Sequence, residues 1–174
     1  MNKLINALGF QAGWWACIAG VGQGLELEAI GFCAILAGAH LYFSQFPLQE
    51  LKLAALALLL GILLDSCLQL LAVIDFYGWA LGPLSPFWLW ALWVLFALTL
   101  NSSLAFLQRQ TLLLSAMLGL VFGPLTYYAG AKLGAAGLDT SPVHLLSLAL
   151  AWMLAMPVLV MAAQYTSHNP KETP

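Results

Sequence analysis

The chain has 174 residues, of which 63% are hydrophobic and only 7% are charged. Soluble domains contain about 25% charged residues and about 45–50% apolar residues, so the composition excludes an ordinary soluble domain. Only five Lys and Arg residues are present and they are scattered, so nucleic-acid binding is not expected. Long uncharged runs can cross a bilayer as helices of about 20 residues. The composition therefore predicts an all-α, polytopic integral membrane protein.

Apolar windows and helix breakers predict six transmembrane helices in a single domain over residues 1–165, followed by a polar cytoplasmic tail over 166–174. The predicted helices cover residues 4–24, 27–46, 50–74, 87–107, 111–131 and 143–165. Pro47 separates the second and third helices. Ser85 with Pro86, and Ser141 with Pro142, each pair an N-cap residue with a proline at the first helical position. The short QRQ link predicts that the fourth and fifth helices are antiparallel neighbours.

The orientation of the predicted bundle follows from its basic residues. Lys3, Lys52, Arg109 and Lys171 fall on one side of the membrane, whereas Lys132 alone falls on the other. Cytoplasmic loops carry the excess of Lys and Arg. We therefore expect both the N and the C terminus in the cytoplasm.

Polar side chains recur at a similar depth in four of the predicted helices: Gln11, His40, Asp65 and Asn101. A carboxyl group in the middle of a membrane helix is costly, and an ionisable residue there is by default a functional hypothesis. We expect Asp65 either to stay ionised, by pairing with His40 or accepting hydrogen bonds from Asn101, Gln11 and Ser66, or to stay protonated. The simpler interpretation is a polar clamp that holds the helices together.

Three further residues join this predicted site. Gln69 lies one helical turn after Asp65, on the same face of the predicted helix. Trp14 is suited to core packing or to the wall of a pocket for a flat or long apolar ligand. Tyr127 belongs to the segment TYYAGAK, which offers a landing point for a phosphate or carboxylate. The predicted ligand-binding residues are therefore Asp65, His40, Asn101, Gln11, Gln69, Trp14 and Tyr127.

The sequence shows no spacing typical of metal ligands and no nucleophile or phosphotransfer signature. We therefore predict no metal, no cofactor and no catalytic residue. Small residues recur nearly every four positions in the first helix, at Gly9, Gly13, Ala16, Gly20 and Gly24. Such stripes let helix backbones approach closely. Intramolecular packing is the favoured interpretation, and a docking face for a membrane partner is the alternative.

Three stretches carry a family resemblance: GILLDSCL (61–68), PFWLWALWVLFALTLNSSLAFL (86–107) and GLVFGPLTYYAGAKLGA (119–135). In these stretches, and over nearly its whole length, the chain resembles the bacterial Domain of Unknown Function 2878 family of short inner-membrane proteins. The resemblance implies a multi-pass protein of the bacterial cytoplasmic (inner) membrane, in a setting beside lipid-modifying enzymes. It implies no particular activity.

Four functions are compatible with these observations. The first is an integral membrane protein that binds a lipid-like or small amphipathic molecule, or assists a lipid-modifying partner. The second is a substrate-binding subunit of a multi-component small-molecule importer, an analogy of architecture alone. The third is an intramembrane enzyme with Asp65 as general acid or base and His40 as its partner, which the missing signatures disfavour. The fourth is a purely structural role in membrane assembly.

Overall fold

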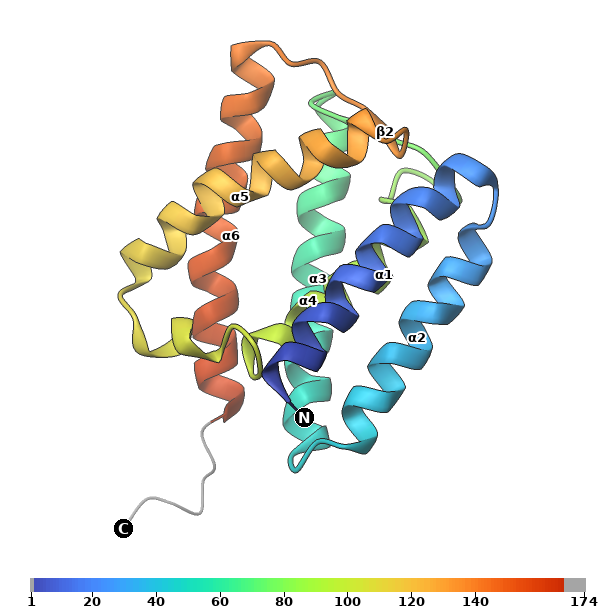
Figure 1. Ribbon diagram of the computed structural model, residues 1–174. Helices are drawn as coiled ribbons and strands as arrows, with labels where there is room; N and C mark the ends of the chain where they lie inside the picture. Colours follow the sequence, from blue (N-terminus) through green and yellow to red (C-terminus); the bar gives the residue numbers. More distant parts are fainter. Residues whose placement is uncertain (1, 168–174) are drawn as a thin grey trace.

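The computed structural model describes residues 2–167 (Figure 1). It contains six α-helices, which confirms the predicted all-α fold. They are α1 (Lys3–Gln23), α2 (Glu26–Tyr42), α3 (Pro47–Leu70), α4 (Phe87–Leu100), α5 (Leu112–Lys132) and α6 (Pro142–Ser167). A 3-10 helix, η1 (Ala105–Arg109), precedes α5, and two short strands, β1 (Asp75–Phe76) and β2 (Ala136–Gly137), pair antiparallel. Helix α6 runs two residues into the predicted tail, and the rest of that tail lies outside the described residues.

Four of the described helices are long and apolar enough to cross a membrane: α1, α3, α5 and α6. Helix α2 has 17 residues and carries Glu26 and Glu28 in its first turn. Helix α4 has 14 residues, which is about 21 Å of helix against a hydrocarbon core of about 30 Å. Length and composition therefore support a helical membrane protein with four long apolar helices.

The helix ends follow local chemistry. Pro142 begins α6, as predicted, whereas α3 begins at Pro47 and not at residue 50. Gly24 ends α1 in the left-handed conformation, with φ of 71°, which glycine adopts without steric cost. The prediction that Ser85 caps α4 is wrong, because that helix start has no side-chain cap and the Ser85 hydroxyl accepts from the Trp90 indole instead.

Helix α4 is shorter than predicted and ends at Leu100 instead of residue 107. The Ser103 N–H donates to the Asn6 side chain on α1, at 3.2 Å, and not to a carbonyl of its own helix. The Leu104 N–H reaches back five residues to the Thr99 carbonyl, at 2.8 Å. A long-range side-chain contact therefore interrupts the α-helical hydrogen-bond pattern that the apolar run alone would continue.

Helix α4 lies in the centre of the bundle and packs against α1, α2, α3 and α6. The predicted adjacency of the fourth and fifth helices is wrong, because α5 packs mainly against α6 and crosses it obliquely (Figure 1). Gly119 makes this crossing close, since a Cβ there would lie 2.2 Å from the Trp152 carbonyl oxygen. The connection over residues 101–111, which includes η1, carries the chain away from α4.

The glycines of α1 serve packing within the bundle. A Cβ at Gly13 would lie 2.5 Å from Leu95 Cδ1 on α4, and one at Gly20 would lie 3.0 Å from the Ala29 Cβ on α2. Both positions therefore need a residue without a side chain for the neighbouring helix to approach. This confirms the intramolecular interpretation of the small-residue stripe at these two positions.

The segment between α3 and α4, residues 71–86, folds across one end of the bundle. Its β1 strand pairs with β2, which follows α5. Glu26 at the start of α2 holds the segment, since the Trp79 N–H lies 3.0 Å from both of its carboxylate oxygens. Gly78 adopts φ of 113° beside that carboxylate, a conformation open to glycine. The segment forms a fixed cover over this end of the helices.

Candidate functional site

Asp65 lies on α3 with its side chain fully enclosed, at 0% exposure. Its Oδ2 atom accepts a hydrogen bond of 2.7 Å from the Trp93 indole N–H on α4, and its Oδ1 atom accepts one of 2.5 Å from the Tyr127 hydroxyl on α5. Gly61, one turn earlier, leaves room for the indole, because a Cβ there would lie 2.2 Å from the Trp93 ring. Both carboxyl oxygens are thus held by donors from neighbouring helices. We call Asp65, Trp93 and Tyr127 the Asp65 cluster.

An aromatic wall continues from the Asp65 cluster to α6. The Trp93 ring stacks on Trp152, with centroids 5.1 Å apart and an interplanar angle of 8°. The Tyr127 ring meets Trp152 edge-on, with centroids 5.9 Å apart. Gly123 on α5 leaves the space for this wall, since a Cβ there would lie 2.2 Å from Trp152 Cγ. The packed rings fix the directions in which Trp93 and Tyr127 donate to Asp65.

The same aromatic wall lines a cavity of about 630 Å³, a volume within the range of about 300–1,000 Å³ for small-molecule sites. Helices α1, α4, α5 and α6 contribute to its lining, together with the residues around η1 and the two strands. Apart from the tryptophan indoles, its polar lining residues are Gln11, Thr126 and Tyr127. The cavity is therefore an apolar site with few polar groups.

The cavity narrows toward the strands. There Ile18 on α1 approaches α5, with its Cδ1 atom 3.3 Å from where a Cβ on Gly130 would lie. Ile74 and Ala135, which flank β1 and β2, line this closed end. From it α1 and α5 diverge toward their N-terminal ends (Figure 1), where Phe10 and Phe106 line the cavity. We call that side the wide end.

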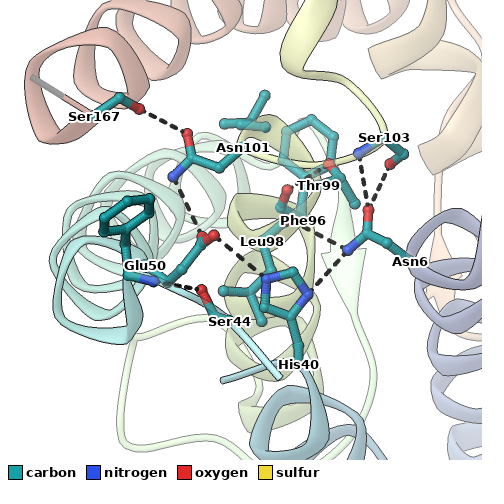
Figure 2. A network of polar contacts seen from close by, with 12 residues as sticks. Asn6, His40, Ser44, Glu50, Phe96, Leu98, Thr99, Asn101, Ser103 and Ser167 are labelled. Carbon is teal, nitrogen blue, oxygen red and sulfur yellow. Dashed lines mark hydrogen bonds and ion pairs between the residues drawn. The ribbon is translucent and has the colours of Figure 1, made fainter. Parts of the chain in front are cut away.

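A second polar cluster, the end network, links Asn6, His40, Glu50, Asn101 and Ser103 (Figure 2). His40 Nδ1 lies 3.3 Å from Asn6 Nδ2, and His40 Nε2 lies 3.5 Å from Glu50 Oε1. The Asn101 amide donates to Glu50 Oε2 at 3.3 Å. The Ser103 hydroxyl donates to Asn6 Oδ1 at 2.6 Å. The network ties α1, α2, α3 and the residues after α4 together at one end of the bundle.

The hydrogen bonds of Asn6 fix the tautomer of His40. Asn6 Oδ1 accepts from the Ser103 N–H, and Asn6 Nδ2 donates to the Leu98 carbonyl at 3.2 Å. The amide nitrogen therefore faces His40 Nδ1, which must accept. The imidazole proton then lies on Nε2 and points at Glu50. Asn6, His40 and Glu50 are all buried, so this network satisfies its polar groups internally.

The predicted convergence of Gln11, His40, Asp65 and Asn101 does not form. The structure brings His40 and Asn101 together, but through Glu50. Asp65 bonds to none of these residues and belongs to the separate Asp65 cluster. Gln11 is exposed and lines the cavity. Similar depth along the membrane normal does not bring side chains together when their helices present different faces to one another.

The remaining predicted site residues fall around the cavity and on α3. Trp14 and Tyr127 both line the cavity. The Oε1 atom of Gln69 is buried and has no hydrogen-bond partner among the described residues. The Ser66 hydroxyl accepts from the Ser85 N–H at 2.9 Å and does not reach Asp65. No three His, Cys, Asp or Glu side chains in the described part of the chain are grouped so that they could hold a metal ion.

Two buried polar residues, Asn6 and Glu50, were missed by reasoning from the sequence. A signal for Glu50 exists: it and His40 are equally far from Gln45 in the short turn between α2 and α3. An antiparallel helix pair joined by such a turn places the two residues at the same depth. The role of Asn6 follows from its contacts with α2, α4 and Ser103, which no local sequence pattern predicts.

Comparison with known proteins identifies one family. The model of a family described as "Protein of unknown function (DUF2878)" matches residues 3–158. No curated protein and no solved structure matches the chain.

Proposed function

The chain belongs to the DUF2878 family of proteins of unknown function, and we propose that it binds a lipid-like or amphipathic molecule within the bacterial inner membrane. The proposed protein crosses the membrane six times, with both termini in the cytoplasm. Its ligand occupies the cavity between α1, α4 and α5. Such a protein acts by holding its ligand or by presenting it to a lipid-modifying partner.

The cavity is the observation that carries this proposal. It is large enough for a small-molecule ligand and is lined mainly by aromatic and aliphatic side chains. It lies between two helices, α1 and α5, that are each long and apolar enough to cross a bilayer. A molecule already dissolved in the bilayer can enter between them without passing through water.

The proposed topology has support in the charge distribution. Lys3, Lys52 and Arg109 lie at or near the ends of their elements on the side of the N terminus. Glu26 and Asp75 lie at the other end, around the segment that covers the helices. This asymmetry matches the positive-inside rule. Helices α2 and α4 complete six crossings when the packed loops beyond their ends fill the remaining thickness.

Native mass spectrometry of protein extracted gently from bacterial membranes tests the proposal. Thr126 is exposed on α5 and lines the cavity, so Thr126→Trp fills the cavity from its side. Val121 is 47% exposed on the same helix and is not among the cavity-lining residues, so Val121→Trp is the matched control. We expect a bound amphiphile on the wild type and on Val121→Trp, and its loss from Thr126→Trp. Equal retention by both variants would contradict binding in this cavity.

A structural role is the second candidate function. Asp65 has both oxygens bonded within the bundle, and the end network likewise pairs its own groups. Interhelical hydrogen bonds of this kind stabilise membrane bundles by about 0.6–2 kcal/mol each. Under this proposal the cavity retains no lipid through extraction, and the wild type and Thr126→Trp carry the same bound masses.

A further inference from the structure

The cavity is apolar, and this limits what it can select. Lipid tails in the bilayer are as apolar as the side chains that line the cavity, so a tail gains no hydrophobic free energy by moving from bilayer to protein. Selectivity for one amphiphile must therefore come from polar or charged groups near the cavity. Only a few polar groups line the cavity itself, so the charged groups at its two ends decide the question.

The closed end is unsuited to an anionic group. Asp75 belongs to the segment that covers this end, and Glu26 lies beneath that segment and accepts a hydrogen bond from it. Lys132 is the basic residue nearest to it, and its ammonium group lies 5.4 Å from the centre of the Tyr128 ring. Ile74 and Ala135 line the cavity here. The end beneath the strands therefore favours the apolar end of a ligand.

Two basic residues lie beyond the cavity-lining residues of the wide end, one on α1 and one in η1. Phe10 lines the cavity on α1, and Lys3 lies seven residues earlier, which is two helical turns and the same helix face. Phe106 lines the cavity in η1, and Arg109 lies three residues later, where side chains of a 3-10 helix eclipse. Both basic residues are exposed, and neither has an ion-pair partner in the part of the chain that the structure describes.

The end network fixes the position of the wide end. Ser103 is bonded to Asn6 through both its N–H and its hydroxyl, and the next residue, Leu104, already lines the cavity. The network thereby holds η1, with Arg109, on the same end of the bundle as the start of α1 (Figure 1). Among the described residues, the acid at this end is Glu50, which is buried and occupied by His40 and Asn101.

We propose that the ligand of this cavity is an anionic phospholipid, with one acyl chain in the cavity and its phosphate between Lys3 and Arg109. The proposal rests on the function proposed above and names the class of its ligand. The lipid comes from the leaflet on the side of the chain termini, where the headgroup region meets the wide end. Arginine pairs with phosphate through two parallel N–H donors, and lysine adds a point charge.

The test compares lipids that differ only in headgroup. Purified protein is placed in nanodiscs that contain phosphatidylglycerol and phosphatidylcholine with identical acyl chains, and the retained lipid is identified by native mass spectrometry after release. Two basic contacts predict a preference for phosphatidylglycerol of about 30-fold. The preference should fall as salt is raised, because exposed charges are screened. A fatty acid with the same chain is a separate arm that distinguishes a carboxylate from a phosphate.

The variants separate the two proposals. Lys3→Gln with Arg109→Gln should abolish the headgroup preference, because retention of phosphatidylglycerol falls to the level of phosphatidylcholine. Lys52→Gln removes an exposed basic residue near the same end, on α3, which contributes no residue to the cavity lining, and it should keep the preference. Equal retention of both phospholipids by the wild type, or a preference that survives in the double variant, overturns the anionic phospholipid. Stronger retention of the fatty acid than of phosphatidylglycerol also overturns it. Retention unaffected by Thr126→Trp overturns the function proposed above instead.

Discussion

Replacement of Asp65 by leucine should destabilise the bundle, because it removes the acceptor of two buried donors. The Trp93 indole N–H and the Tyr127 hydroxyl both point at the carboxyl group, at 2.7 and 2.5 Å. Leucine has the same number of side-chain heavy atoms with the same branching at Cγ, but it accepts neither bond. The aromatic wall holds both donors in place, so they cannot turn to other partners without repacking.

The expected loss can be bounded from both sides. A buried donor left without a partner costs about 1–3 kcal/mol, and interhelical hydrogen bonds in membranes are worth about 0.6 kcal/mol on average and at most about 1.7. Two orphaned donors therefore predict a loss of about 2–4 kcal/mol in the free energy of unfolding. Asp65→Asn should lose less than about 1.5 kcal/mol. Its amide oxygen accepts from Trp93 when it takes the place of the Asp65 Oδ2 atom, and its amide nitrogen donates to the Tyr127 oxygen once that hydroxyl rotates.

The assay is reversible unfolding in mixed micelles with increasing dodecyl sulfate, followed by far-ultraviolet circular dichroism. Tyr127→Phe supplies the internal control. In the Asp65→Leu background it removes one orphaned hydroxyl, so the double variant should recover part of the lost stability. A single Asp65→Leu variant as stable as the wild type, with no recovery in the double variant, would refute the assignment of the Asp65 cluster as an interhelical clamp.

Two further substitutions test the packing and the end network. Gly61→Ala places a Cβ 2.2 Å from the Trp93 ring and should cost about 1–3 kcal/mol through overpacking; Gly38→Ala, where nothing lies within 4 Å, should be neutral or slightly stabilising by the same unfolding assay. Asn6→Leu removes the acceptor of the Ser103 N–H and hydroxyl, so amide hydrogen exchange over residues 101–109 should accelerate, while exchange in the middle of α3 stays unchanged. Unchanged exchange after Asn6→Leu would show that the network does not hold this connection.

The sequence was sufficient for those features that depend on composition and local chemistry. Each of the six predicted apolar runs contains a helix, and Pro142 marks the start of α6 because proline fits the first turn and lacks a donor. Burial of Asp65 was also predictable, since it lies in the middle of such a run. None of these inferences requires knowledge of which helices are neighbours.

The partners of Asp65 were not predictable, because they depend on which faces of the helices meet. Counting residues inward gives depth and leaves the rotation of each helix undetermined. The observed donors are also an indole and a phenol, which a hydrophobicity pattern counts as apolar, and not strongly polar side chains. Gly61 held the useful signal. A residue without a side chain one turn before a buried acid makes room for a large aromatic ring from the next helix.

The end of α4 shows the same difficulty in the backbone. The apolar run continues past Leu100, and local propensity gives no reason to stop there. The helix ends where the Ser103 N–H bonds to Asn6, ninety-seven residues away in the sequence. The polar side chains just beyond Leu100 are compatible with a helix end there. The acceptor that makes this end favourable is the Asn6 side chain, which belongs to α1.

The two polar clusters have a consequence for specificity. In each cluster the buried donors and acceptors are directed at one another: Trp93 and Tyr127 at Asp65, and His40 and Asn101 at Glu50. A ligand that competed for these groups would leave a protein donor or acceptor unpaired, at about 1–3 kcal/mol for each. Recognition is therefore more favourable at exposed groups that lack partners. A headgroup is therefore expected to bind at the basic residues of the wide end and not at Asp65.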